Sequence, residues 1–188
     1  MNTPNKLTLL RVVMIPVFLV FLLCSGIPHN YLWALLVFTA ASLTDLLDGY
    51  LARKYELITD FGKFMDPLAD KLLVTSALIC FIQLGFADAL VVVIIVAREF
   101  LVTSLRLVAS TNGKVIAADI FGKLKTVSQI VAIVAILLLQ ELVSSGFLIS
   151  AGLAAAVGNI LMWIVAVLTV CSGANYLWKN RSFINTAK

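Results

Sequence analysis

Four aspartates are the residues of this sequence whose spacing carries the clearest chemistry. Asp45 and Asp48 are three positions apart, and Asp66 and Asp70 are four positions apart, so on helices each pair shares one face. The surrounding sequence is apolar, and a carboxylate at membrane depth is costly unless a partner neutralises it. Clustered acidic oxygens are ligands that hard divalent cations such as Mg²⁺, Mn²⁺ and Ca²⁺ prefer. The spacing therefore predicts a metal site at a membrane surface, built from two antiparallel helices.

The residues between the aspartates suit the binding of a phosphorylated ligand. Gly49 and Ala52 remove side-chain bulk, so that a ligand can lie against the helix. Arg53 can pair with a phosphate in a fork geometry. Gly62 permits close backbone approach. A pair of cations beside a phosphate can activate both a nucleophile and a leaving group, which favours chemistry on a lipid headgroup.

Two alternatives to a metal site stay open at this point. Single aspartates can be structural, with Asp66 as a helix N-cap before Pro67, or Asp45 paired with Arg53. A small transporter with an acidic ion site also uses intramembrane acids, but such acids usually lie near the midplane. The acids of this chain cluster at one end of their apolar stretches, which favours the surface site.

The elements that must position these residues are transmembrane helices. The chain has 188 residues and is 62% hydrophobic, against about 45–50% in soluble domains. Three separated cysteines argue against a disulfide framework or a zinc site. We expect one all-α integral membrane domain over residues 1–188, with a short interfacial segment at 2–7 and no nucleic-acid partner. Six apolar stretches predict six transmembrane helices at 7–24, 31–50, 67–86, 89–109, 120–142 and 147–178. Most are near the length of a membrane span, and the last is longer.

The lysines and arginines are distributed asymmetrically between the connections. The segments 25–30, 85–88 and 140–146 contain none of the 14. The positive-inside rule then places both termini, the aspartate pattern and residues 110–125 in the cytoplasm. Near the last exit, Tyr176 and Trp178 are typical of an interfacial aromatic belt.

The whole pattern, D-x2-D-G-x2-A-R-x8-G-x3-D-x3-D, resembles the signature of the CDP-alcohol phosphotransferase family at every signature position. The resemblance implies six transmembrane helices, an active site at the cytoplasmic end, and a homodimer. It implies two Mg²⁺ or Mn²⁺ ions held by Asp45, Asp48, Asp66 and Asp70, with Asp70 also the catalytic base. It further implies contacts to the CDP moiety from Gly49, Ala52, Arg53 and Gly62.

Further segments resemble one branch of that family, the branch that produces phosphatidylglycerol phosphate. They are Pro4–Arg11, Ala97–Phe100 followed by Arg106, and Gly122–Thr126. The resemblance implies transfer of a phosphatidyl group from CDP-diacylglycerol to sn-glycerol 3-phosphate, with release of CMP. Other branches, which make cardiolipin, phosphatidylinositol phosphate or phosphatidylserine, remain alternatives, as does the transporter.

A dianionic acceptor such as glycerol 3-phosphate requires a basic pocket. Arg98 interrupts an apolar run and lies about two helical turns from Arg106, on one face. Lys123 and Lys125 open the fifth stretch and can face the same pocket, although cations at such positions also snorkel to the membrane surface. Glu99 points about 100° away from Arg98 around the helix, so we expect it to be a poor partner.

Three residues outside these groups complete the sequence-based predictions. Thr8 and Arg11, early in the first stretch, can line either the acceptor pocket or the metal site. His29 lies on the opposite side of the membrane by the predicted topology, and we expect no catalytic role for it. The short chain without a transit segment suggests a bacterial plasma membrane, with the active site at the cytoplasmic face.

Overall fold

The structure is a computed structural model, and it describes residues 3–54, 60–111, 120–147 and 150–181. Within those ranges, the side chains of residues 3–4, 46, 48–54, 60–64, 66–67 and 110–111 are outside the description.

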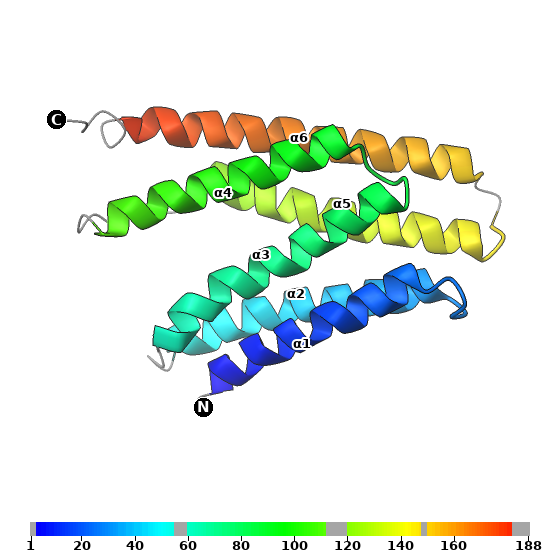
Figure 1. Cartoon of the computed structure of the whole chain (residues 1–188), viewed down its shortest axis with the longest axis horizontal. Helices are drawn as coiled ribbons and strands as arrows, with labels where there is room; N and C mark the ends of the chain where they lie inside the picture. The colour runs from blue at the N-terminus through cyan, green and yellow to red at the C-terminus, as the bar shows by residue number, and fades with distance from the viewer. Residues whose placement is uncertain (1–2, 55–59, 112–119, 148–149, 182–188) are drawn as a thin grey trace.

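Six helices make up the described chain, and no strand occurs in it, which confirms the all-α prediction. The helices are α1 (Thr3–Leu23), α2 (Asn30–Lys54), α3 (Asp60–Gln83), α4 (Ala89–Thr111), α5 (Ile120–Ser144) and α6 (Ala151–Lys179). Successive helices run back and forth, so that α1 begins and α6 ends at the same end of the molecule (Figure 1). The aspartate-bearing end of α2 and the start of α3 also lie at that end.

Glycines end two of the helices at the opposite end. Gly85 has φ 75° and Gly146 has φ 77°, a left-handed conformation that side chains disfavour. After α3, the Phe86 N–H donates to the Phe81 carbonyl at 2.8 Å and the Gly85 N–H to the Ile82 carbonyl at 3.1 Å. This pair of bonds is the Schellman ending, which reverses the chain at once and makes the short α3–α4 connection possible.

Three of the six helices meet the requirements for a membrane span in the part of the chain that the structure describes. They are Asn5–Leu23 of α1, Ile120–Ser144 and Ala151–Lys179. The sequence predicted six membrane spans, but only three of the described helices are long and apolar enough to cross a membrane. In α4, Arg98, Glu99 and Arg106 interrupt the apolar sequence. In α2 and α3 the stretches described with side chains are shorter than a span.

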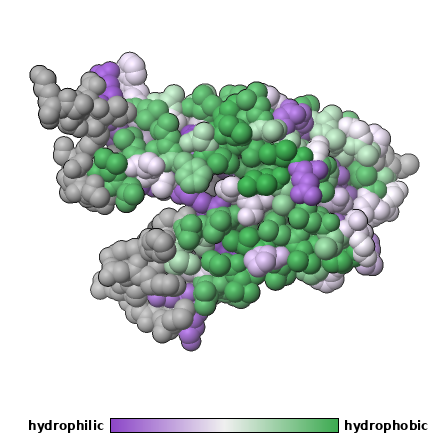
Figure 2. All heavy atoms as spheres, in the orientation of Figure 1, coloured by the Kyte–Doolittle hydropathy of each residue, from purple (hydrophilic) through white to green (hydrophobic). Residues whose placement is uncertain are grey.

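The core is formed where α1 packs against α2 and α3, and where α6 packs against α4 and α5. Phe18 of α1 and Phe38 of α2 meet with ring centroids 5.6 Å apart. Small buried residues such as Ala41 and Ala77 let the helix backbones approach closely. Most of the outer surface is apolar, as expected in lipid, and it is hollowed between the two groups of helices, where polar residues show (Figure 2).

Candidate active site

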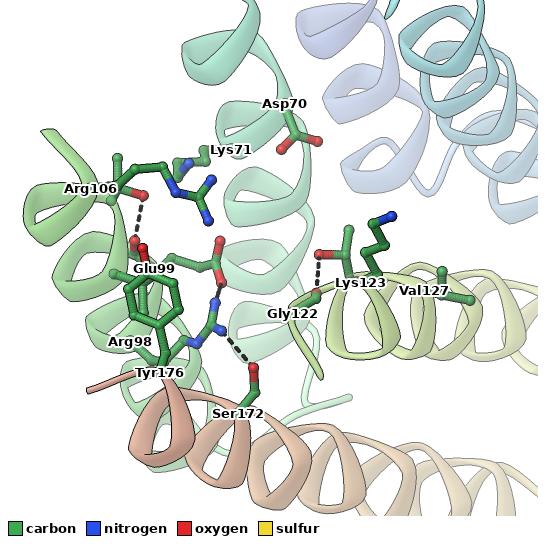
Figure 3. Close-up of a pocket in the computed structure, with 13 residues that line it drawn as sticks. Asp70, Lys71, Arg98, Glu99, Arg106, Gly122, Lys123, Val127, Ser172 and Tyr176 are labelled. Atoms are coloured by element: carbon green, nitrogen blue, oxygen red, sulfur yellow. Dashed lines mark hydrogen bonds and ion pairs between the residues drawn. The ribbon is translucent and has the colours of Figure 1, made fainter. Parts of the chain in front are cut away.

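A polar cavity of about 420 Å³ lies between α3, α4, α5 and α6 (Figure 3). We call it the polar cavity. Its lining residues come from four consecutive helices. They are Asp70, Lys71, Arg98, Glu99, Val102, Thr103, Arg106, Gly122, Lys123, Thr126, Val127, Ser172 and Tyr176. Three of the predicted acceptor-site cations, Arg98, Arg106 and Lys123, are thus brought together beside Asp70.

Arg98 is held by two neighbours at the wall of this cavity. Its Nη1 donates to Glu99 Oε1 at 3.0 Å, and its Nη2 donates to Ser172 Oγ of α6 at 2.7 Å (Figure 3). The expectation that Glu99 would be a poor partner was therefore wrong. The Cβ directions of the two residues do diverge, but both side chains are long enough to curl toward each other.

Lys125 lies behind the same wall and does not line the polar cavity. Its side chain is 2% exposed, and its Nζ donates to Glu99 Oε1 at 2.6 Å. A buried ammonium requires such a partner, because removing it from water without one is costly. Glu99 therefore links Arg98 and Lys125, and the acceptor role predicted for Lys125 stays a prediction.

Arg106 and Tyr176 form the side of the cavity toward the ends of α4 and α6. The Arg106 guanidinium carbon lies 5.9 Å from the centroid of the Tyr176 ring, within the range of a cation–π contact. Tyr176 is buried, which corrects its assignment to an interfacial belt. Trp178, two residues further on, is exposed at 69%, as that assignment expects.

The polar cavity carries a surplus of positive charge. Four cationic side chains line it (Lys71, Arg98, Arg106 and Lys123), against two carboxylates, Asp70 and Glu99. Counted formally, two positive charges are left over. A cavity with this balance can bind a small dianion such as a phosphate monoester.

An apolar groove of about 320 Å³ lies on the other side of Asp70, between α2, α3 and α5, with Arg11 of α1 at its wall. We call it the apolar groove. Its walls are mainly aliphatic, from residues such as Val74, Ile130 and Val134. Asp70 lines both the polar cavity and the apolar groove. The carboxylate therefore lies where a polar compartment meets a lipid-like one.

Asp45 also lines the apolar groove, and it is paired with Arg11 across the α1–α2 interface. Arg11 Nη1 lies 2.7 Å from Asp45 Oδ1, and the Arg11 side chain is fully buried. Arg11 therefore borders the apolar groove that Asp45 and Asp70 also line. Of the two places that the sequence left open for Arg11, the acceptor pocket and the predicted metal site, it lies at the second. Thr8, one turn earlier, is buried.

The remaining predicted site residues have side chains outside the part of the chain that the structure describes. They are Asp48, Gly49, Ala52 and Arg53 in α2, and Gly62 and Asp66 in α3. Accordingly, the described residues contain no group of three or more potential metal ligands. The two aspartates that are described come from different helices and line one groove, so their donor set fits a hard divalent cation.

Several residues that line the polar cavity were not predicted from the sequence. Lys71, which follows Asp70 directly, lines the cavity but was not among the predicted site residues. Ser172 and Tyr176 share a face of α6 with Thr169 and Gly173, and all four are buried. A run of small and polar residues at helical spacing in an otherwise apolar helix was the available signal.

His29 lies at the opposite end of the molecule, directly before α2. Its Nδ1 is 2.6 Å from Glu141 Oε1 of α5. It contacts neither the polar cavity nor the apolar groove, and its expected lack of a catalytic role stays a prediction.

Comparison with known proteins identifies the class to which this fold and site correspond. Residues 1–171 match the family model described as CDP-alcohol phosphatidyltransferase, and the chain belongs to that family. Among its relatives, a CDP-diacylglycerol–glycerol-3-phosphate 3-phosphatidyltransferase of Bacillus subtilis is 42% identical over 99% of this chain and 98% of its own length. A protein of the same name from Rickettsia typhi is 39% identical over 93% of this chain and 94% of its own. A probable phosphatidylglycerophosphate synthase of Mycobacterium tuberculosis is 44% identical over 94% of this chain and 80% of its own.

Proposed function

We propose that this membrane protein transfers the phosphatidyl group of CDP-diacylglycerol to sn-glycerol 3-phosphate, giving phosphatidylglycerol phosphate and CMP. The names of relatives that match almost the whole chain support this reaction. The observation that carries the proposal is the polar cavity with two surplus positive charges, which ends at Asp70. Glycerol 3-phosphate is a small dianion that complements this charge.

The acceptor binds in the polar cavity. Arg98, Arg106 and Lys123 bind its phosphate, and Lys71 contributes positive charge nearby. The arginines favour a phosphate because the planar guanidinium presents two parallel donors. With the phosphate held at this wall, the glycerol part points toward Asp70.

The lipid donor reaches the same carboxylate from the other side. An acyl chain of CDP-diacylglycerol lies in the apolar groove, whose aliphatic walls match it. Gly49, Ala52, Arg53 and Gly62 contact the CDP moiety, as their match to the family signature implies. The two substrates then meet at Asp70, and most of the rate enhancement comes from holding them in line.

Asp45, Asp48, Asp66 and Asp70 would hold two divalent metal ions per site, Mg²⁺ or Mn²⁺. When bound, they supply positive charge that stabilises the diphosphate and the departing CMP. The ion pair with Arg11 holds the Asp45 carboxylate at the wall of the apolar groove.

Asp70 accepts the proton of the acceptor's 1-hydroxyl group. The hydroxyl oxygen then forms a bond to the phosphorus of the phosphatidyl group. The bond between that phosphorus and the CMP oxygen breaks, and CMP leaves with the electron pair.

The protein lies in a bacterial plasma membrane as a homodimer, with both termini and the polar cavity at the cytoplasmic face. The distribution of lysine and arginine supports this orientation. Cys24 is exposed at the opposite end, so a membrane-impermeant maleimide should label it in intact cells. Labelling only after the cells are opened would reverse the orientation, and a monomeric mass in detergent would contradict the dimer.

The experiment that tests the reaction is CMP release by purified protein in detergent with CDP-diacylglycerol and Mg²⁺ or Mn²⁺. Glycerol 3-phosphate, inositol phosphate, serine and phosphatidylglycerol are supplied singly. We expect turnover with glycerol 3-phosphate alone, and its loss when EDTA removes the metal. Turnover with another acceptor would reassign the branch, and turnover in EDTA would overturn the metal assignment.

A further inference from the structure

Arg98 lies directly against a glycine of the facing helix. A Cβ atom added at Gly173 of α6 would lie 3.0 Å from Arg98 Cγ and 3.6 Å from its Nε. The first distance is shorter than ordinary van der Waals contact, so the arginine would have to move by a few tenths of an ångström. The absence of a side chain at position 173 thus gives the Arg98 stem its present path.

The neighbouring residue holds the other end of the same side chain. Ser172 is buried, and its Oγ accepts the hydrogen bond from Arg98 Nη2 at 2.7 Å. Glu99 accepts from Nη1 on the same guanidinium. Ser172 and Gly173 together therefore fix the path of the stem and the rotation of the guanidinium plane, as Figure 3 shows for the serine.

These contacts matter because recognition of a phosphate by arginine depends on orientation. A guanidinium binds two phosphate oxygens only when its plane is aimed at them, whereas an ammonium acts as a point charge. A displacement of less than 1 Å in such a group is enough to weaken a bidentate contact.

We propose that Ser172 and Gly173 of α6 are positioning residues that aim Arg98 at the acceptor's phosphate, and that they thereby set the preference for a phosphorylated alcohol. This inference rests on the proposed function, because it takes a phosphate-bearing acceptor in the polar cavity. It adds α6, which contains none of the signature residues, to the elements that determine specificity.

The test compares Gly173→Ala and Ser172→Ala with Gly158→Ala. Gly158 is the matched control, because it is also a buried glycine of α6, but its added Cβ would meet Ile136 at 3.4 Å, away from the polar cavity. For each protein, CMP release gives kcat and the KM for each substrate. Inorganic phosphate, tested as a competitive inhibitor, reports on the phosphate contact alone.

We expect Gly173→Ala and Ser172→Ala to raise the KM for glycerol 3-phosphate about 10-fold, the size expected for one hydrogen bond to a charged group. The inhibition constant of phosphate should rise by a similar factor, while the KM for CDP-diacylglycerol stays within about twofold. Gly158→Ala should leave all three constants near wild type. In an Arg98→Lys background, Gly173→Ala should have little further effect, because the two changes act through one side chain.

An unchanged KM for glycerol 3-phosphate in both α6 variants would overturn the inference. Full additivity with Arg98→Lys would also overturn it, because the glycine would then act elsewhere. These failures differ from failure of the proposed function, in which the wild-type protein itself releases no CMP with glycerol 3-phosphate.

Discussion

The two ends of the helix bundle each contain a partly or fully buried glutamate that binds a cationic or potentially cationic side chain from another element. At one end, Glu99 Oε1 lies 2.6 Å from Lys125 Nζ and 3.0 Å from Arg98 Nη1. At the other, Glu141 Oε1 lies 2.6 Å from His29 Nδ1. Glu141 Oε2 also accepts the Leu32 N–H at 3.1 Å, in the first turn of α2.

The surroundings of the two glutamates differ. Both carboxylate oxygens of Glu141 are occupied, one by His29 and the other by the Leu32 N–H. The His29 side chain is 61% exposed. Glu99 borders the polar cavity, where Lys71, Arg106 and Lys123 are cations beyond those that it pairs with. A buried ion pair by itself is therefore weak evidence of a site. A binding site is distinguished from a structural ion pair by an excess of positive charge around an open cavity. This criterion can be tested by substitutions at the Glu99 end and at the Glu141 end of the bundle.

The largest effect expected is that of Asp70→Asn, which removes the base but keeps the shape. We expect the rate of CMP release to fall by about 1000-fold or more, because general-base catalysis and metal binding are lost together. The thermal unfolding midpoint in detergent, measured alongside, should stay near that of the wild type. Turnover within tenfold of the wild type would remove Asp70 from the mechanism.

Arg106→Ala should raise the KM for glycerol 3-phosphate by about 10- to 100-fold, because one charged contact to the phosphate is lost. The chain offers a matched control at the same end of the molecule. Arg181 stacks on Trp178, 4.8 Å from the ring centroid, as Arg106 stacks on Tyr176, but it does not line the polar cavity. Arg181→Ala should leave the KM within about twofold. Equal effects of the two substitutions would mean that general surface charge, not the cavity, attracts the acceptor.

Glu99→Gln should lower stability and acceptor binding together. It leaves the Lys125 ammonium buried beside a neutral amide, which we expect to cost about 3 kcal/mol of unfolding free energy. Arg98 loses its charged partner at the same time, so the KM for glycerol 3-phosphate should rise. Thermal unfolding and CMP-release kinetics on one preparation measure both. A stability loss without any kinetic change would separate Glu99 from the binding site.

Glu141→Gln is the counterpart at the far end, and it should have the smallest effect. The amide can still accept the Leu32 N–H, so we expect a loss of about 1 kcal/mol. All kinetic constants should match the wild type. A raised KM for glycerol 3-phosphate in this variant would show that the two ends are coupled, and the contrast drawn above would fail.

Much of the fold and part of the site could be predicted from the sequence. The helices follow from apolar runs of span length separated by polar breaks. Arg98 and Arg106 could be predicted as residues of a polar cavity, because a cation inside an apolar run is costly unless it is paired or faces water. Asp70 was predictable because its helical spacing from Asp66 places two carboxylates on one face.

Pairings between distant helices were not predictable in the same way. The contact of Arg11 with Asp45 depends on how α1 packs against α2. The sharing of Glu99 by Arg98 and Lys125 depends on the curl of long flexible side chains, which helical wheels do not capture. Tyr176 was misassigned because an aromatic residue near a helix end is typical of a membrane interface as well as of a pocket wall.

The position of Asp70 between the polar cavity and the apolar groove has a consequence for how the reaction rate responds to its substrates. One substrate arrives by diffusion through water, and its supply is measured as a molar concentration. The other arrives by lateral diffusion in the bilayer, and its supply is measured as a mole fraction of the lipids. Dilution of the membrane with inert lipid or detergent should therefore slow the reaction at constant bulk concentrations, although the aqueous substrate is saturating.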